Sequence, residues 1–262
     1  MDEIRFHTEL YYDIQKMRIE AGNRLGQLER DGMDAERAKY LQDWIDERLV
    51  KVEKEIMGIA ANYVKTEPVY LEFLKDVKGI GPVISACLIS WLRPYFRDTV
   101  VCLECGHTEP ADFTTHNGRH PDQCAECESE KILYPFSTIS ALWRYCGMDV
   151  RNGEAPRRQK GRKIDWNPRL RTLCWKISDS LIKVQGPYRE RYLTAKDAYQ
   201  REHPEPEPSG RKSKAGKEIM RYTKQHIHLL AKRKVVKPFL AELWLKWREL
   251  EGLPVRGPYN HQ

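Results

Sequence analysis

The sequence predicts a mainly α-helical protein that carries one small cysteine-rich insertion. Three observations support this fold class. Apolar residues recur at intervals of three and four over long stretches, two helix-like segments flank a Gly-Ile-Gly turn, and four cysteines fall in two closely spaced pairs. Intervals of three and four place apolar side chains on one face of a helix. With 262 residues, 40 % of them apolar, the chain has room for one large or two small domains.

The first element, residues 1–66, is expected to be a helical hairpin. Leu10, Ile14 and Met17 begin a helical repeat that resumes after a break at Gly32 and reaches Ile56. Charged residues of both signs lie between the apolar ones. The pattern favours a coiled-coil-like arm through which two copies of the chain could form a homodimer, and equally a helical pair packed within a monomer.

Residues 67–96 have the pattern of a helix-hairpin-helix motif. Glycine at both ends of the Gly-Ile-Gly turn permits positive φ, and Pro82 stands where a first-turn proline is tolerated. Backbone N–H groups at such a turn, together with the positive end of a helix dipole, can bind a nucleic-acid phosphate without reading a base. The alternative is an ordinary buried turn between helices. The residues expected at the phosphate are Lys75, Lys78, Gly79, Ile80 and Gly81.

Residues 97–135 interrupt the helices and contain two C-x-x-C pairs separated by eighteen residues. This spacing is typical of a structural zinc site, in which four thiolates close a tetrahedral shell and zinc supplies much of the folding free energy. The alternative, two disulfides, is disfavoured because the chain start has no signal-peptide pattern. The predicted Zn²⁺ ligands are Cys102, Cys105, Cys124 and Cys127. His107, His116 and His120 are expected at the surface, and Cys87, Cys146 and Cys174 in the core.

The helical domain is expected to resume over residues 136–200. Its first helix should start at a Ser or Thr cap and end at Gly147, and a second should start at Asn167-Pro168. Between them lies a basic loop, residues 151–171. Residues 201–217 are rich in Pro, Glu and Lys and predict a linker, and residues 218–262 predict a final basic and aromatic helix that completes the domain.

Charge is segregated along the chain. The total of 45 Lys and Arg against 38 Asp and Glu gives a net charge of +7, which mildly favours a polyanionic partner. The basic loop holds eight Arg or Lys against two acidic residues. No run of 18 apolar residues is present, so we expect no membrane span and a cytoplasmic, nucleoid-associated protein. The basic residues expected to contact nucleic acid are Arg157, Arg158, Lys160, Arg162, Lys163, Arg169 and Arg171.

The order of these parts resembles a known family over residues 50–250. The segments that carry the resemblance are GIGPVISACLI, FSTISALWRYCGM, NPRLRTLCWKISDSLI and HIHLLAKRKVVKPFLAELW. They are similar to the carboxy-terminal half of insertion-sequence transposases that join a RuvC-like nuclease domain to a helix-hairpin-helix domain, the RNA-guided, serine-dependent type. The resemblance implies DNA binding, transposition or recombination of mobile elements, and oligomers formed through the coiled coil.

Two departures from that family bear on catalysis. The acidic nuclease residues of the family lie on an amino-terminal RNase H-like domain, whereas this chain starts at the helical arm. The serine of the family lies in a Gln-Ser-Gly-like segment, and the nearest match here is Gln159-Lys160-Gly161. We therefore expect DNA binding without catalysis by the chain alone. The alternatives are an active recombinase subunit that works with a separate nuclease, and an RNA-binding adaptor.

Overall fold

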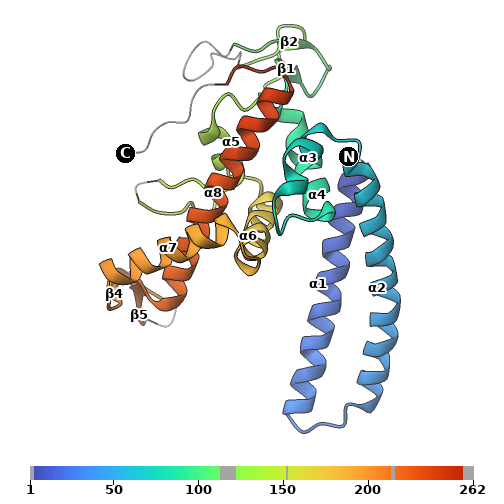
Figure 1. The fold of residues 1–262 in the computed structure, drawn as a ribbon, viewed down its shortest axis with the longest axis vertical. Coiled ribbons are helices and arrows are strands. Elements are labelled where there is room, and N and C mark those ends of the chain that lie inside the picture. The colour runs from blue at the N-terminus through green and yellow to red at the C-terminus, as the bar shows by residue number, and fades with distance from the viewer. Residues whose placement is uncertain (1–2, 113–121, 152, 214–215, 256–262) are drawn as a thin grey trace. The chain divides into compact units, whose positions relative to one another are not determined.

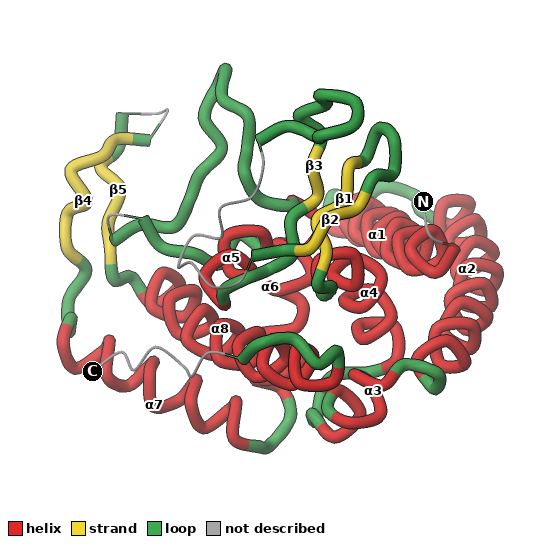
Figure 2. The backbone as a smooth tube through the Cα atoms, turned by 90° about the horizontal axis from the view of Figure 1, so that it is seen from above, coloured by secondary structure: helices red, strands yellow, loops and turns green. Residues whose placement is uncertain are grey.

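The computed structural model describes residues 3–112, 122–151, 153–213 and 216–255 (Figures 1 and 2). Over these ranges the predicted fold class is confirmed, with eight α-helices and two small antiparallel sheets. Two compact units can be distinguished: Met1–Leu71 with Gly81–Arg93, and Glu72–Ile80 with Pro94–Gln262. No helix in the described part of the chain has the length and apolar character needed to cross a membrane.

The first unit contains an antiparallel pair of long helices, α1 (Glu3–Arg30) and α2 (Glu36–Val64) (Figure 1). Helix α4 (Pro82–Leu92) packs against both of them. The guanidinium of Arg5 lies 4.1 Å from the ring centroid of Trp91 and donates to the Ser90 carbonyl. The buried apolar residues of this unit include Ile56, Ala60, Val64, Ala86, Leu88, Ile89 and Leu92.

The second unit is built around helix α8 (Lys224–Leu250), which packs against α5 (Ile139–Tyr145), α6 (Pro168–Lys183) and α7 (Pro187–Glu202). Local sequence explains where these helices start. The Thr138 side chain accepts from the Ala141 N–H to cap α5, and Asn167 caps α6 ahead of a first-turn proline. The buried residues of this core include Leu142, Met148, Leu170, Ile177, Phe239, Leu243, Trp244 and Trp247.

The cysteine-rich insertion forms a three-stranded antiparallel sheet in the order β2-β1-β3. Its strands are β1 (Thr99–Cys102), β2 (Thr108–Pro110) and β3 (Ile132–Leu133). Strand β1 pairs with both neighbours, and Val101 faces Thr108 on one side and Leu133 on the other. The sheet is too small to bury much apolar surface, so its order has to come from another source.

The predicted linker over residues 201–217 is wrong in its central part. Strand β4 (Glu207–Lys212) pairs with β5 (Glu218–Arg221), and α8 starts at Lys224 instead of at residue 218. The local composition predicts coil, but side-chain contacts with Glu154 and Tyr222, which lie outside the segment, stabilise the hairpin. The His203 ring stacks on Tyr222 with centroids 3.3 Å apart, and arginines from both strands contact Glu154.

The first helix of the predicted helix-hairpin-helix motif is interrupted. Helix α3 (Pro68–Glu72) is followed by a short 3₁₀ turn, Leu74–Asp76, with Phe73 between them at φ −146°. The second helix is α4, as expected from Pro82. The segment 68–76 is too short for hydrophobic periodicity to distinguish one continuous helix from two successive turns.

Candidate metal centre and basic cleft

The four cysteines of the two C-x-x-C pairs converge on one point of the second unit. All four Sγ atoms lie within 4.8 Å of one another, and two pairs, Cys102–Cys127 and Cys105–Cys124, are each 3.6 Å apart. A tetrahedral ion with metal–sulfur bonds of about 2.3 Å places its sulfur ligands about 3.8 Å apart. The arrangement therefore fits a metal ion bound by four thiolates.

The two halves of this centre repeat the same backbone turn. The Cys102 N–H donates to the His107 carbonyl, and the Cys124 N–H donates to the Ser129 carbonyl. In each half the residue four positions after the first cysteine has positive φ, Gly106 at +78° and Glu128 at +56°. Such paired turns hold both thiols of a pair on the same side of the backbone, so the cluster is formed by local geometry as well as by the sheet.

Hydrogen bonds favour the thiolate form of Cys102. Backbone N–H groups, that of Cys105 foremost, lower the pKa of the Cys102 thiol to about 6, whereas the pKa values of the Cys105 and Cys127 thiols are raised because hydrogen bonding among the thiols and burial outweigh the hydrogen bonds from the His107 and Ser129 backbones. The thiolate is the form that binds a metal. His107 is not in the ligand cluster found among the described residues, and His116 and His120 lie outside those residues.

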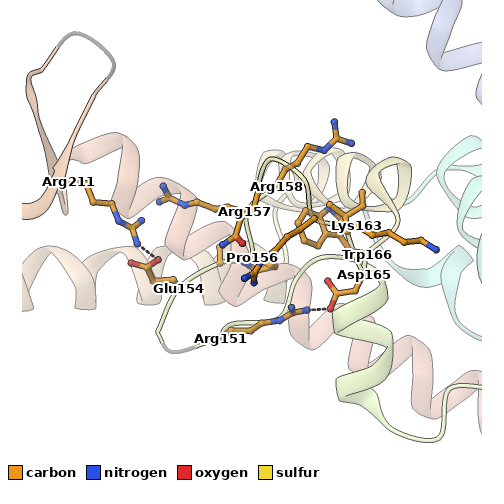
Figure 3. Close-up of a pocket in the computed structure, with 13 residues that line it drawn as sticks. Arg151, Glu154, Pro156, Arg157, Arg158, Lys163, Asp165, Trp166 and Arg211 are labelled. Atoms are coloured by element: carbon orange, nitrogen blue, oxygen red, sulfur yellow. Dashed lines mark hydrogen bonds and ion pairs between the residues drawn. The ribbon is translucent and has the colours of Figure 1, made fainter.

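The basic loop forms one wall of a cleft of about 650 Å³ in the second unit (Figure 3). Its lining has six cationic and two acidic side chains, together with one aromatic residue, Trp166. The charged lining residues are Arg151, Glu154, Arg157, Arg158, Arg162, Lys163, Asp165 and Arg211. An excess of cations around a concave surface attracts anions and concentrates them there.

Both acidic residues of the cleft are already neutralised by arginines. Arg151 donates to Asp165 at 2.6 Å, and Arg211 and Arg221 each contact one carboxylate oxygen of Glu154 (Figure 3 shows Arg151 and Arg211). The hydrogen bond from Arg211 lowers the pKa of Glu154. These two ion-paired acids therefore fix the walls of the cleft.

The exposed cations of the loop are the groups most able to receive an anion. Five of them, all within residues 157–163, form no ion pair with another described residue. Arg157 and Arg158 lie between Glu154 and Asp165 in the view of Figure 3. These five cations are Arg157, Arg158, Lys160, Arg162 and Lys163.

Arg171 has a different place from the one that the sequence predicts. Its guanidinium donates to the Pro156 carbonyl at 2.9 Å and lies 5.1 Å from the Trp166 ring centroid. Burial lowers its pKa, and its side chain fills the space that a Cβ at Gly147 would occupy. Arg171 therefore anchors the loop to α6, and we assign it no direct contact with a ligand.

The remaining predicted cations are exposed but are not gathered in this cleft, and Ile80 is buried. Lys160 and Arg169 are not among its lining residues, although both are exposed. Lys75 is exposed as well, and Lys78 lines a separate hollow of about 390 Å³ in the second unit, beside Asp76 and Arg191. Arg151, Trp166 and Arg211 also line the cleft but were not predicted from the sequence. Arg211 could not be found in this way, because it lies on strand β4, 40 residues beyond the end of the basic loop at Arg171.

The two turn glycines differ from the expectation that both take positive φ. Gly79 does so, at φ +94°, but Gly81 has φ −86° and precedes α4 as its N-cap. The Ile80 N–H donates to the Val77 carbonyl. This N–H, one of those expected to bind a phosphate, therefore already has a partner within the turn. The Gly79 carbonyl accepts from the Ser180 hydroxyl, so this part of the turn is packed on α6.

This difference predicts unequal effects of the same substitution. A Cβ at residue 79 would lie 3.0 Å from the Ser180 carbonyl oxygen in a backbone conformation that L-residues avoid, whereas nothing lies within 4 Å of a Cβ at residue 81. We expect Gly79→Ala to lower the free energy of unfolding by about 1–3 kcal/mol and Gly81→Ala by less than about 1 kcal/mol. Urea denaturation of both variants measures this, and equal losses would contradict the packing of Gly79 on α6.

Comparison with protein-family models, with curated protein sequences and with solved structures found no match to this chain.

Proposed function

We propose that this chain is a DNA-binding protein related to the carboxy-terminal half of the insertion-sequence transposases described above, with a part in transposition or recombination. The observation that carries the binding proposal is the basic cleft, where the exposed side chains of Arg157, Arg158, Arg162 and Lys163 form no ion pair with another described residue. The relation to transposases rests on the order of the sequence segments. Nucleoid association would follow from DNA binding.

The chemistry of the cleft suits a phosphate backbone. Arginine donates up to five hydrogen bonds in a planar fork that matches phosphate oxygens, and the cleft holds five arginines. Such contacts give affinity with little sequence specificity and strong dependence on salt. Exposed Lys75 and Lys78 are proposed as further phosphate contacts.

We propose Zn²⁺ as the ion of the four-cysteine centre, in a structural role. Four thiolates in tetrahedral geometry are the donor set that zinc prefers, and they leave no open position for a catalytic water. The ion would hold the two turns and the small sheet together. We assign no catalytic step to this chain, because the cleft contains neither a paired acidic site nor a serine.

The experiment for the binding proposal compares nucleic acids over a salt series. Fluorescence anisotropy with labelled duplex DNA, branched DNA and structured RNA should show DNA binding whose logarithmic affinity falls linearly with the logarithm of salt, by about 0.9 for each phosphate contacted. Tighter binding to RNA would favour the adaptor alternative. Nicking of supercoiled plasmid with Mg²⁺ would favour the recombinase alternative, and no binding to any probe would overturn the proposal.

We further propose that two copies of the chain associate through the α1–α2 arm. Six apolar residues of this arm have exposed fractions of 48–70 %. A second copy presents the same apolar residues, as a two-fold interface requires. The residues concerned are Met17, Ile19, Met33, Tyr40, Leu41 and Trp44.

The arm proposal predicts a change of mass. The double substitution Tyr40→Ser and Trp44→Ser should convert a dimer to a monomer of 30.9 kDa in light scattering, because it removes the two largest exposed apolar side chains of α2. Lys39→Ser with Asp43→Ser, exposed positions on the same helix, is the matched control. A wild-type chain that is monomeric at all concentrations would contradict the proposal.

A further inference from the structure

The basic cleft contains one aromatic side chain, and its position is fixed from one side. Trp166 is half-buried and lies among the lining side chains in Figure 3. A Cβ at Gly147 would come within 3.1 Å of the Trp166 Cδ1 atom, and the Arg171 guanidinium lies 5.1 Å from the ring centroid. Gly147 and Arg171 therefore hold the indole in place while part of it remains open to the cleft.

Around this ring the cleft combines apolar and cationic walls. Pro156 and Ile164 contribute apolar surface, and Arg157, Arg158 and Arg162 contribute charge. A volume of about 650 Å³ lies within the range of about 300–1,000 Å³ found for pockets that enclose small organic ligands. The cleft can thus take more than a bare phosphate group.

A ring beside unpaired cations is the combination that binds single-stranded nucleic acid. The cations hold the phosphates, and a base stacks on the aromatic face, whichever base it is. In a duplex the faces of the bases are covered by their neighbours, so a side chain on a protein wall cannot stack on them unless the strand is opened. The ring would therefore add affinity only for an unpaired nucleotide.

We propose that the cleft binds an unpaired segment of a nucleic-acid strand, with one base stacked on Trp166 and the flanking phosphates on Arg157, Arg158 and Arg162. This inference rests on the proposed nucleic-acid binding and specifies its ligand. Arg171 and Gly147 act as positioning residues for the ring. Trp166 is the group that distinguishes an unpaired strand from a duplex.

The test removes the base and the ring in turn. The probes are a labelled eight-nucleotide thymidine strand and a strand of equal length with abasic sites throughout, which has the phosphates without the bases. Trp166→Leu keeps apolar contact with Gly147 but has no aromatic face. We expect this substitution to weaken binding of the thymidine strand by about tenfold, the effect of losing one stacked base, and to leave binding of the abasic strand unchanged.

Two further variants separate stacking from folding. Trp166→Phe keeps an aromatic face and should recover most of the affinity for the thymidine strand. Trp143→Leu is the matched control, because Trp143 is also half-buried beside a cation, with Lys237 Nζ 4.0 Å from its ring centroid, but does not line the cleft. It should change neither affinity.

Each other outcome overturns the inference in a recognisable way. Equal weakening of both strands by Trp166→Leu would mean that the ring only supports the loop, and no weakening of either would mean that no base stacks there. In both cases binding itself persists and the proposed function stands. If the wild-type chain binds none of the three probes, neither the thymidine strand nor the abasic strand nor a duplex, then the proposed function fails together with this inference.

Discussion

Removing the metal from the four-cysteine centre is expected to unfold the region from Thr99 to Leu133. Among the described residues of its three strands only Val100 and Cys102 are buried, so the sheet has little apolar surface to stabilise it. Structural zinc binding contributes about 10–16 kcal/mol in small zinc modules. Cys102→Ser should therefore reduce bound zinc from about one per chain to near zero, and limited proteolysis should cut within this region.

The control for this result is a histidine beside the centre. His107→Ala should retain the metal, because the His107 side chain is not among the clustered ligands and His107 supports the turn through its backbone, which the substitution keeps. Elemental analysis of both variants, purified in the same way, gives the comparison. If Cys102→Ser keeps a full complement of zinc and resists protease, the four-thiolate assignment is wrong.

Reversing two charges in the basic loop is expected to have the largest effect on binding. Arg157 and Arg158 are exposed, line the cleft and have no ion pair in the described part of the chain. Arg157→Glu with Arg158→Glu replaces two attractions to phosphate by two repulsions. We expect the affinity for DNA at about 0.1 M salt to fall roughly 100-fold and the salt slope to decrease by about two.

A matched variant changes the same charge elsewhere. Lys39→Glu with Lys54→Glu alters the net charge equally at two exposed positions of helix α2. It should weaken binding by no more than a fewfold, through the overall field alone. Both variants should unfold at the wild-type urea concentration, since exposed substitutions rarely change stability by more than about 0.5 kcal/mol. Equal losses of affinity in the two variants would show that the cleft is not the binding site.

Local signals in the sequence predicted several elements correctly. Thr138 and Asn167 cap the helices that they were expected to start, and the arm breaks at Gly32, which has φ +69°. The two C-x-x-C pairs form one cluster. The caps depend on contacts between residues that are close in sequence, and the break at Gly32 depends on a backbone conformation that favours glycine.

Other features had no local signal. The β4–β5 hairpin occupies a segment whose composition predicts coil, because its stability comes from Glu154 and from the stacking of His203 on Tyr222. Arg171 looks like one more loop cation in the sequence, yet it is turned toward the Pro156 carbonyl. Hydrogen bonds across such distances along the chain leave no periodic pattern.

The sequence by itself determined the helical class, the starts of helices α5 and α6, and the four cysteines that come together. It could do so because capping, periodicity and C-x-x-C spacing act within a few residues. Only the tertiary structure decided which cations of the basic loop form no ion pair, that Arg211 of β4 lines the cleft and pairs with Glu154, and that Trp166 lies in the cleft. Those facts depend on which acidic groups and aromatic rings lie close together in the folded chain. Distance along the sequence does not show which residues are neighbours in the fold.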